Sequence, residues 1–126
     1  DNIVSQESLH ASDVMVSDWS GAALEYSFGL ERPVLFVDVP RKVNNDEYER
    51  VQNEPLEVFI RPEIGAVLPL DQLQKAPACI EELCLNQRKY LDSFRQARGQ
   101  WVFNVGCSGE KGAAYIAQMV SDLESK

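Results

Sequence analysis

Three short runs of apolar residues, each followed by a break, set the pattern of this chain. The runs are residues 14–16, 34–37 and 65–68. Continuous apolar runs of this length are typical of strands that are covered on both faces, as in a parallel sheet. Between the first two runs, Leu24 and Phe28 are one helical turn apart. We therefore expect a helix over residues 21–28 and a β-α-β unit around it.

Residue types predict the ends of this unit. Ser20 is a good N-cap, Gly29 is expected to stop the helix, and Pro33 fixes a stiff turn before the second strand. The expected fold class is α/β, with a Rossmann-like parallel sheet and helices on both of its faces.

The flanking segments give weaker signals. Residues 3–4 look like the end of a strand, and Ser5 is expected to cap a short helix over residues 5–11. Residues 39–53 show no sustained period, which indicates a surface loop with one helical turn near Tyr48. Residues 55–60 are expected to form a brief helix or an extended run.

The second half of the chain is predicted to be mostly helical. Asp71 is a plausible N-cap, Pro77 is suited to a first helical position before residues 78–85, and residues 86–97 continue as an amphipathic helix up to Gly99. Residues 101–105 are apolar and β-prone, which favours a strand, and residues 113–123 are expected to form a last helix.

Ligands of open α/β sheets collect beyond the carboxyl ends of the strands, where helix N-termini offer free N–H groups. Here that place is residues 17–22. Gly21 and Ala22 let a phosphate approach the backbone closely, and the Ser20 hydroxyl adds a donor. Glu25 lies one turn further along and is a good acceptor for two neighbouring hydroxyls, as on a ribose. The plainer interpretation is an ordinary N-cap, a tight turn and a solvated glutamate.

The segment over residues 12–36 resembles the C-terminal nucleotide-binding domain of the CDP-glycerol glycerophosphotransferases of teichoic acid and capsule biosynthesis. The matching positions are Asp18, the aromatic Trp19, the first phosphate-binding serine Ser20, the acidic Glu25 and the pair Arg32-Pro33. Gly21 stands where that family has a second serine. It resembles instead the Ser-Gly turn of other two-domain glycosyltransferases and of sugar epimerases.

The resemblance implies the donor-binding half of a two-domain, GT-B-like transferase. Its reaction would move glycerol phosphate, or a similar polyol phosphate, from a CDP-linked donor to an acceptor hydroxyl. Asp18, Ser20, Gly21 and Ala22 would contact the donor phosphates, and Glu25 the ribose. The family's general base sits on histidines outside the matched segment, so no catalytic residue is assigned here. A nucleotide-sugar donor domain and a non-catalytic α/β docking module stay open as alternatives.

Basic residues offer further phosphate contacts. Arg41 and Lys42 follow the second strand and could reach donor or acceptor phosphates, although an ordinary solvated surface is the better account of them. Lys111 near the last helix is an outside candidate. A P-loop is rejected, because Glu110 separates Gly109 from Lys111 and no serine or threonine follows the lysine.

Composition limits the partners. The chain has 126 residues and a formal charge of −8, which argues against nucleic acid or an anionic membrane as its direct partner. The chain has three cysteines, without a Cys-x-x-Cys pair, and one histidine, His10. This composition indicates reduced thiols in a cytoplasmic protein and predicts no metal site. We expect no cofactor. The start at Asp1 suggests that residues 1–126 are one domain cut from a longer chain, whose N-terminal domain is missing here. We expect that longer protein to associate peripherally with the inner face of the plasma membrane.

Overall fold

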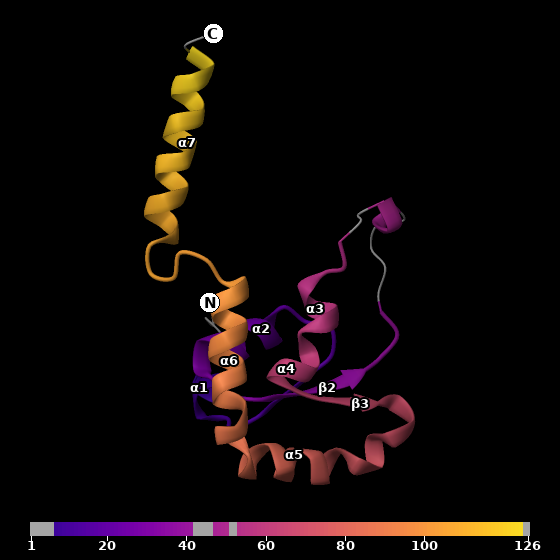
Figure 1. The fold of residues 1–126 in the computed structure, drawn as a ribbon. Coiled ribbons are helices and arrows are strands. Elements are labelled where there is room, and N and C mark those ends of the chain that lie inside the picture. The colour runs from indigo at the N-terminus through magenta and orange to yellow at the C-terminus, as the bar shows by residue number, and fades with distance from the viewer. Residues whose placement is uncertain (1–6, 42–46, 51–52, 125–126) are drawn as a thin grey trace, which may run out of the picture.

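The structure is a computed structural model that describes residues 7–41, 47–50 and 53–124. Its elements, in chain order, are α1 (Glu7–Ala11), β1 (Met15–Ser17), α2 (Ala22–Leu30), β2 (Val34–Asp38), the 3-10 turn η1 (Tyr48–Arg50), α3 (Leu56–Phe59), α4 (Arg61–Ile64), β3 (Gly65–Pro69), the 3-10 segment η2 (Leu70–Lys75), α5 (Ala76–Leu85), α6 (Gln87–Trp101) and α7 (Ser108–Glu124) (Figure 1). The three expected strands and the β-α-β unit are confirmed.

The three strands form a parallel sheet in the order β1-β2-β3. Met15 pairs with Val34, and Val34 pairs with Gly65. All three strands therefore point the same way, and the turns after β1 and β2 leave the sheet at the same edge. The fold is a mixed α/β one, with a small parallel sheet flanked by helices.

Helices cover both faces of the sheet. Because alternate residues of β2 point to opposite sides, this strand contributes side chains to a core on each face. Val34 and Phe36 pack with α2, α4 and α6 in a core that includes Ala23, Ile64 and Phe94. Leu35 packs on the other side with Leu68 of β3 and Leu83 of α5. These β2 side chains are all buried, which explains why the sequence reads as a continuous apolar run.

The end of α2 differs from the prediction. Gly29 was expected to stop the helix, but α2 continues to Leu30, and Glu31 adopts the left-handed conformation with φ 52°. The Glu31 N–H donates to Ser27 O at 2.9 Å. Its carboxylate binds Arg98 at 2.8 Å and Arg95 at 3.2 Å, both on α6. These tertiary contacts place the helix end at Glu31.

Two other helix boundaries were also predicted wrongly. The helix expected to end at Gly99 runs on to Trp101, where the Trp101 ring packs against that of Phe59 with 5.2 Å between their centroids. One exposed glycine costs about 1 kcal/mol, which is too little to break a helix with contacts on both sides of it. Asp71 lies inside η2, and the capping position is Pro69.

The β-prone stretch over residues 101–105 is not a strand. Trp101 ends α6, and the next residues form a turn in which Asn104 and Gly106 have φ 55° and 78°. Phe103 and Val105 are each 71% exposed. A β-prone run becomes a strand only beside a neighbouring strand, and in the described part of the chain none lies next to this one. The last helix also begins earlier than expected, at Ser108 rather than residue 113.

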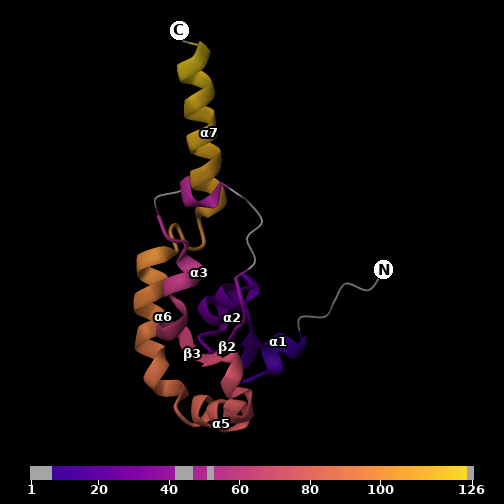
Figure 2. The same cartoon turned by 90° about the vertical axis from the view of Figure 1, so that its right-hand side faces the viewer.

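Helix α7 extends away from the sheet and its covering helices, as both views show (Figures 1 and 2). All of its residues are exposed, including Ile116, Met119, Val120 and Leu123, which recur at helical spacing along one side. The predicted strand end at residues 3–4 and the predicted cap Ser5 lie outside the described residues.

Candidate functional site

The turn after β1 is held to the segment after β2 by a tryptophan. Trp19 donates its indole N–H to the carbonyl oxygen of Val39 at 2.8 Å. Because β1 and β2 are parallel neighbours, this hydrogen bond joins the two chain segments that leave the sheet at its carboxyl edge. The turn that carries the predicted phosphate residues is therefore fixed by the fold.

The backbone at the start of α2 forms local hydrogen bonds. The Ala22 N–H donates to Ser20 Oγ at 3.3 Å, and the Ala23 N–H donates to Ser20 O at 3.1 Å. The capping position itself is Gly21, not Ser20 as expected. The hydrogen bond from the Ala22 N–H to Ser20 Oγ is long for an N–H···O bond, so it engages this N–H only weakly.

A hollow lies between this turn and the start of α3. We call it the strand-end hollow, and its volume is about 420 Å³. Seven residues line it: Asp18, Trp19, Ser20, Arg41, Pro55, Glu57 and Val58. Its charged groups are two carboxylates and one guanidinium, so their formal charges sum to −1.

Arg61 supports the Trp19 wall of this hollow. The Arg61 guanidinium lies over the Trp19 ring, 3.7 Å from the ring centroid, and binds Asp38 at 3.0 Å. Only 8% of Arg61 is exposed, and its buried Nε has no hydrogen-bond partner among the described residues. Sequence reasoning missed Arg61, because 42 residues separate it from Trp19 and no motif marks the pair.

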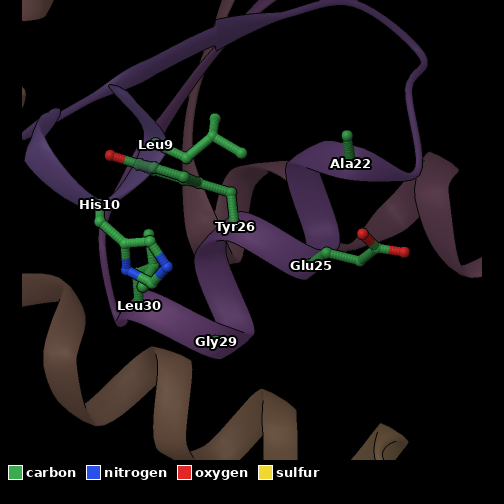
Figure 3. A pocket seen from close by; sticks show the side chains of 7 residues that line it. All are labelled: Leu9, His10, Ala22, Glu25, Tyr26, Gly29 and Leu30. Atoms are coloured by element: carbon green, nitrogen blue, oxygen red, sulfur yellow. The ribbon is translucent and has the colours of Figure 1, made fainter. Parts of the chain in front are cut away.

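A second hollow, the α1–α2 pocket, lies on the other side of the turn and has a volume of about 290 Å³. Leu9, His10, Ala22, Glu25, Tyr26, Gly29 and Leu30 line it (Figure 3). The Glu25 carboxylate is turned toward the Ala22 end of α2, and the His10 imidazole does not point toward it. The apolar side chains form most of its wall.

Two hydrogen-bonded groups hold α1 against α2 and so shape this pocket. The buried Tyr26 hydroxyl donates to Ser12 O at 2.8 Å. Arg32, which the motif resemblance had singled out, donates to the carbonyl oxygens of His10, at 2.7 Å, and of Ser12. Arg32 therefore has a structural role at this position.

The predicted site residues divide between the two hollows. Asp18, Ser20 and Arg41 line the strand-end hollow, whereas Ala22 and Glu25 line the α1–α2 pocket. Gly21 lies between them, and a Cβ added to it would meet no atom within 4 Å. The predicted phosphate contact Lys42 lies outside the described residues.

Other candidates from the sequence lie elsewhere. Lys111 belongs to α7, which extends away from the sheet (Figure 1). Cys79, Cys84 and Cys107 are free thiols. Across residues 7–41, 47–50 and 53–124, no three His, Cys, Asp or Glu side chains are grouped closely enough to hold a metal ion. The same residues include no helix with the length and hydrophobicity needed to cross a bilayer.

Comparison with known proteins identified no relative. No family model, no curated protein and no solved structure matches this chain.

Proposed function

We propose that this chain is the donor-nucleotide domain of a transferase, part of a larger Rossmann-like, GT-B-like enzyme. The donor is a nucleoside diphosphate linked to a polyol or sugar, and the motif resemblance favours CDP-glycerol in teichoic acid or capsule biosynthesis. One observation carries the proposal. The Ser20–Ala22 turn lies between two hollows, each lined by residues that the sequence had singled out.

The arrangement suggests how such a donor would lie. Its ribose hydroxyls would bind Glu25 in the α1–α2 pocket, and its diphosphate would cross the open backbone at Gly21. The amide of Ala22 and the hydroxyl of Ser20 would donate to the phosphate oxygens, helped by the positive end of α2. Arg41 would add a charge-assisted contact from the strand-end hollow.

In this scheme the chain contributes binding and charge stabilisation to the reaction. Donors fixed at the diphosphate stabilise the negative charge that develops as the nucleotide leaves, and they position the donor for attack by the acceptor hydroxyl. The general base and the acceptor site belong to the N-terminal domain that the resemblance implies. We expect the chain by itself to bind the donor without turnover.

Two other functions compete with this one. A nucleotide-sugar donor domain uses the same turn and pocket, and the lining of the strand-end hollow by Trp19 and two carboxylates favours it. A non-catalytic docking module would instead bind a protein partner through the negatively charged surface of the chain. The exposed apolar side of α7 favours this docking function. Nucleotide binding separates the docking module from the other two.

The test is a calorimetric and NMR titration of the chain with CDP. We expect amide shifts to cluster at Ser20, Gly21 and Ala22. The Gly21→Val variant should bind at least about tenfold more weakly, because a branched side chain covers the amides that an anion needs. It should still fold, since Gly21 is helical with φ −59° and the added side chain meets open space.

Gly99→Val is the matched control, because Gly99 also lies in a helix with nothing within 4 Å of an added Cβ. It should bind CDP like the wild type. Shifts that cluster around residues 106–112 would move the site to the start of α7, and a lack of binding at millimolar CDP would overturn the proposed function.

The role of Glu25 is tested with a second ligand. The wild type should bind a 2′,3′-dideoxy nucleotide more weakly than the ribose form, because the analogue lacks both hydroxyls. Glu25→Gln should lose roughly 1 to 3 kcal/mol of ribonucleotide binding and should discriminate less between the two ligands. Equal discrimination by both proteins would remove Glu25 from the ribose site.

A further inference from the structure

The strand-end hollow combines an apolar wall with polar groups of mostly negative charge. Trp19, Pro55 and Val58 supply the apolar surface, and Asp18 and Glu57 supply two carboxylates. Neither carboxylate has a hydrogen-bond partner or ion pair recorded among the described residues. These carboxylates accept hydrogen bonds readily, but they repel a phosphate.

Trp19 is held as a rigid wall on this side. The Arg61 guanidinium covers one face of the indole, and the indole N–H is bound to Val39 O. Arg61 does not line the hollow, so the indole separates the guanidinium from the space inside. Pre-ordered contacts of this kind lower the entropy cost of binding a ring against the wall.

We propose that the strand-end hollow binds a sugar ring, as the group linked to the donor diphosphate. The flat C–H face of the ring packs on Trp19, while its hydroxyls donate to Asp18 and Glu57 and accept from Arg41. The inference deepens the proposed function and rests on it, because the diphosphate places the sugar in this hollow. It selects a sugar over a three-carbon polyol, since a ring has a flat C–H face to set against Trp19 and an open three-carbon chain has none.

The experiment compares three ligands of the full chain by calorimetry: CDP, CDP-glycerol and CDP-glucose. CDP-glucose should bind about tenfold more tightly than the other two, which is the gain expected from one or two hydrogen bonds and a packed ring. Asp18→Asn combined with Glu57→Gln should remove this advantage, so that the variant binds CDP-glucose no more tightly than it binds CDP. Both side chains are partly or fully exposed, so the variant should fold.

Glu81→Gln on α5 is the control for the loss of charge and should keep the advantage of CDP-glucose. Trp19→Leu should also remove the advantage, with its folding checked by circular dichroism. Equal affinities for CDP-glycerol and CDP-glucose, or an advantage that survives in the Asp18/Glu57 variant, would overturn the sugar site while the nucleotide site stands.

A separate measurement covers the case in which none of the three CDP compounds binds, which refutes the proposed function. The chain is then titrated with methyl β-glucoside alone, and the indole N–H signal of Trp19 is followed by NMR, assigned with a Trp101→Phe variant. A saturable shift that the Asp18/Glu57 variant lacks supports the sugar site by itself. No shift up to molar concentrations of the glucoside overturns it.

Discussion

At the scale of single residues, Gly65 is the glycine with the least space around it. A Cβ added there would lie 1.8 Å from the carbonyl oxygen of Val34, its partner across the sheet. Gly65 has φ 170°, which is extended backbone open to any residue, so its requirement for glycine is one of space. Backbone atoms of β2 cannot move away without breaking the β2–β3 ladder.

We therefore predict that Gly65→Ala destabilises the protein by at least about 3 kcal/mol, measured by urea unfolding. Gly99→Ala is the control, because an added Cβ there meets open space inside α6. That change should stabilise the protein by up to about 1 kcal/mol, the difference in helix propensity. A Gly65→Ala protein as stable as the wild type would show that β2 and β3 do not approach as closely as described.

At the scale of elements, an ion-pair cluster joins the end of α2 to α6. Hydrogen bonding from Arg95 has the largest effect on the pKa of Glu31. Together with the Coulomb attraction of Arg95 and Arg98, it lowers this pKa below the ordinary value of 4.5, although desolvation acts in the opposite direction. Arg98 also donates to Phe28 O at 2.9 Å. The carboxylate thus fixes where α2 ends against α6.

The sign of the resulting pH dependence follows from this lowered pKa. The stabilising contribution of the Glu31 carboxylate is fully present above pH 4.5 and is lost as the pH falls through its pKa in the folded protein. Glu31→Gln should therefore be less stable than the wild type at pH 7, and the difference should shrink below pH 4.5. A stability difference that stays constant from pH 7 to pH 3 would contradict the ion-pair account.

At the scale of the whole molecule, α7 is separate from the layered body. Its residues are all exposed, whereas the two cores are built from β1–β3, α2, α4, α5 and α6. Most of the stability of protein helices comes from the packing of an amphipathic face, so an apolar side of this kind ordinarily reflects packing against another surface. Nothing in the described residues shows what covers it.

We predict that deleting residues 106–126 leaves the body folded. Its thermal midpoint should change by less than about 4 °C, the shift that about 1 kcal/mol produces in a domain of this size. Helical circular dichroism should fall as α7 is removed, while the near-ultraviolet signal of Trp19 should persist. A larger drop in the midpoint would show that α7 packs on the body in solution.

The sequence by itself determined the α/β class and the three strands, because each strand is a short apolar run and the first half of β2 is buried on both faces. It also determined the position of the candidate turn, since a strand, a short loop and a helix in succession place that loop at the carboxyl edge of a parallel sheet. It did not determine where helices stop. At Gly29 and Gly99 a local cost of about 1 kcal/mol was outweighed by contacts with distant elements.

Only the tertiary structure decided how the site is divided. Ser20 and Glu25 are five residues apart, yet they line different hollows, because α1 packs on one side of α2 while α3 and Arg41 lie on the other side of the turn. The support of Trp19 by Arg61 was equally hidden, since a contact across 42 residues leaves no local pattern in the chain. Local periodicity reports which side of an element is buried, whereas the identity of its neighbour depends on how the whole chain packs.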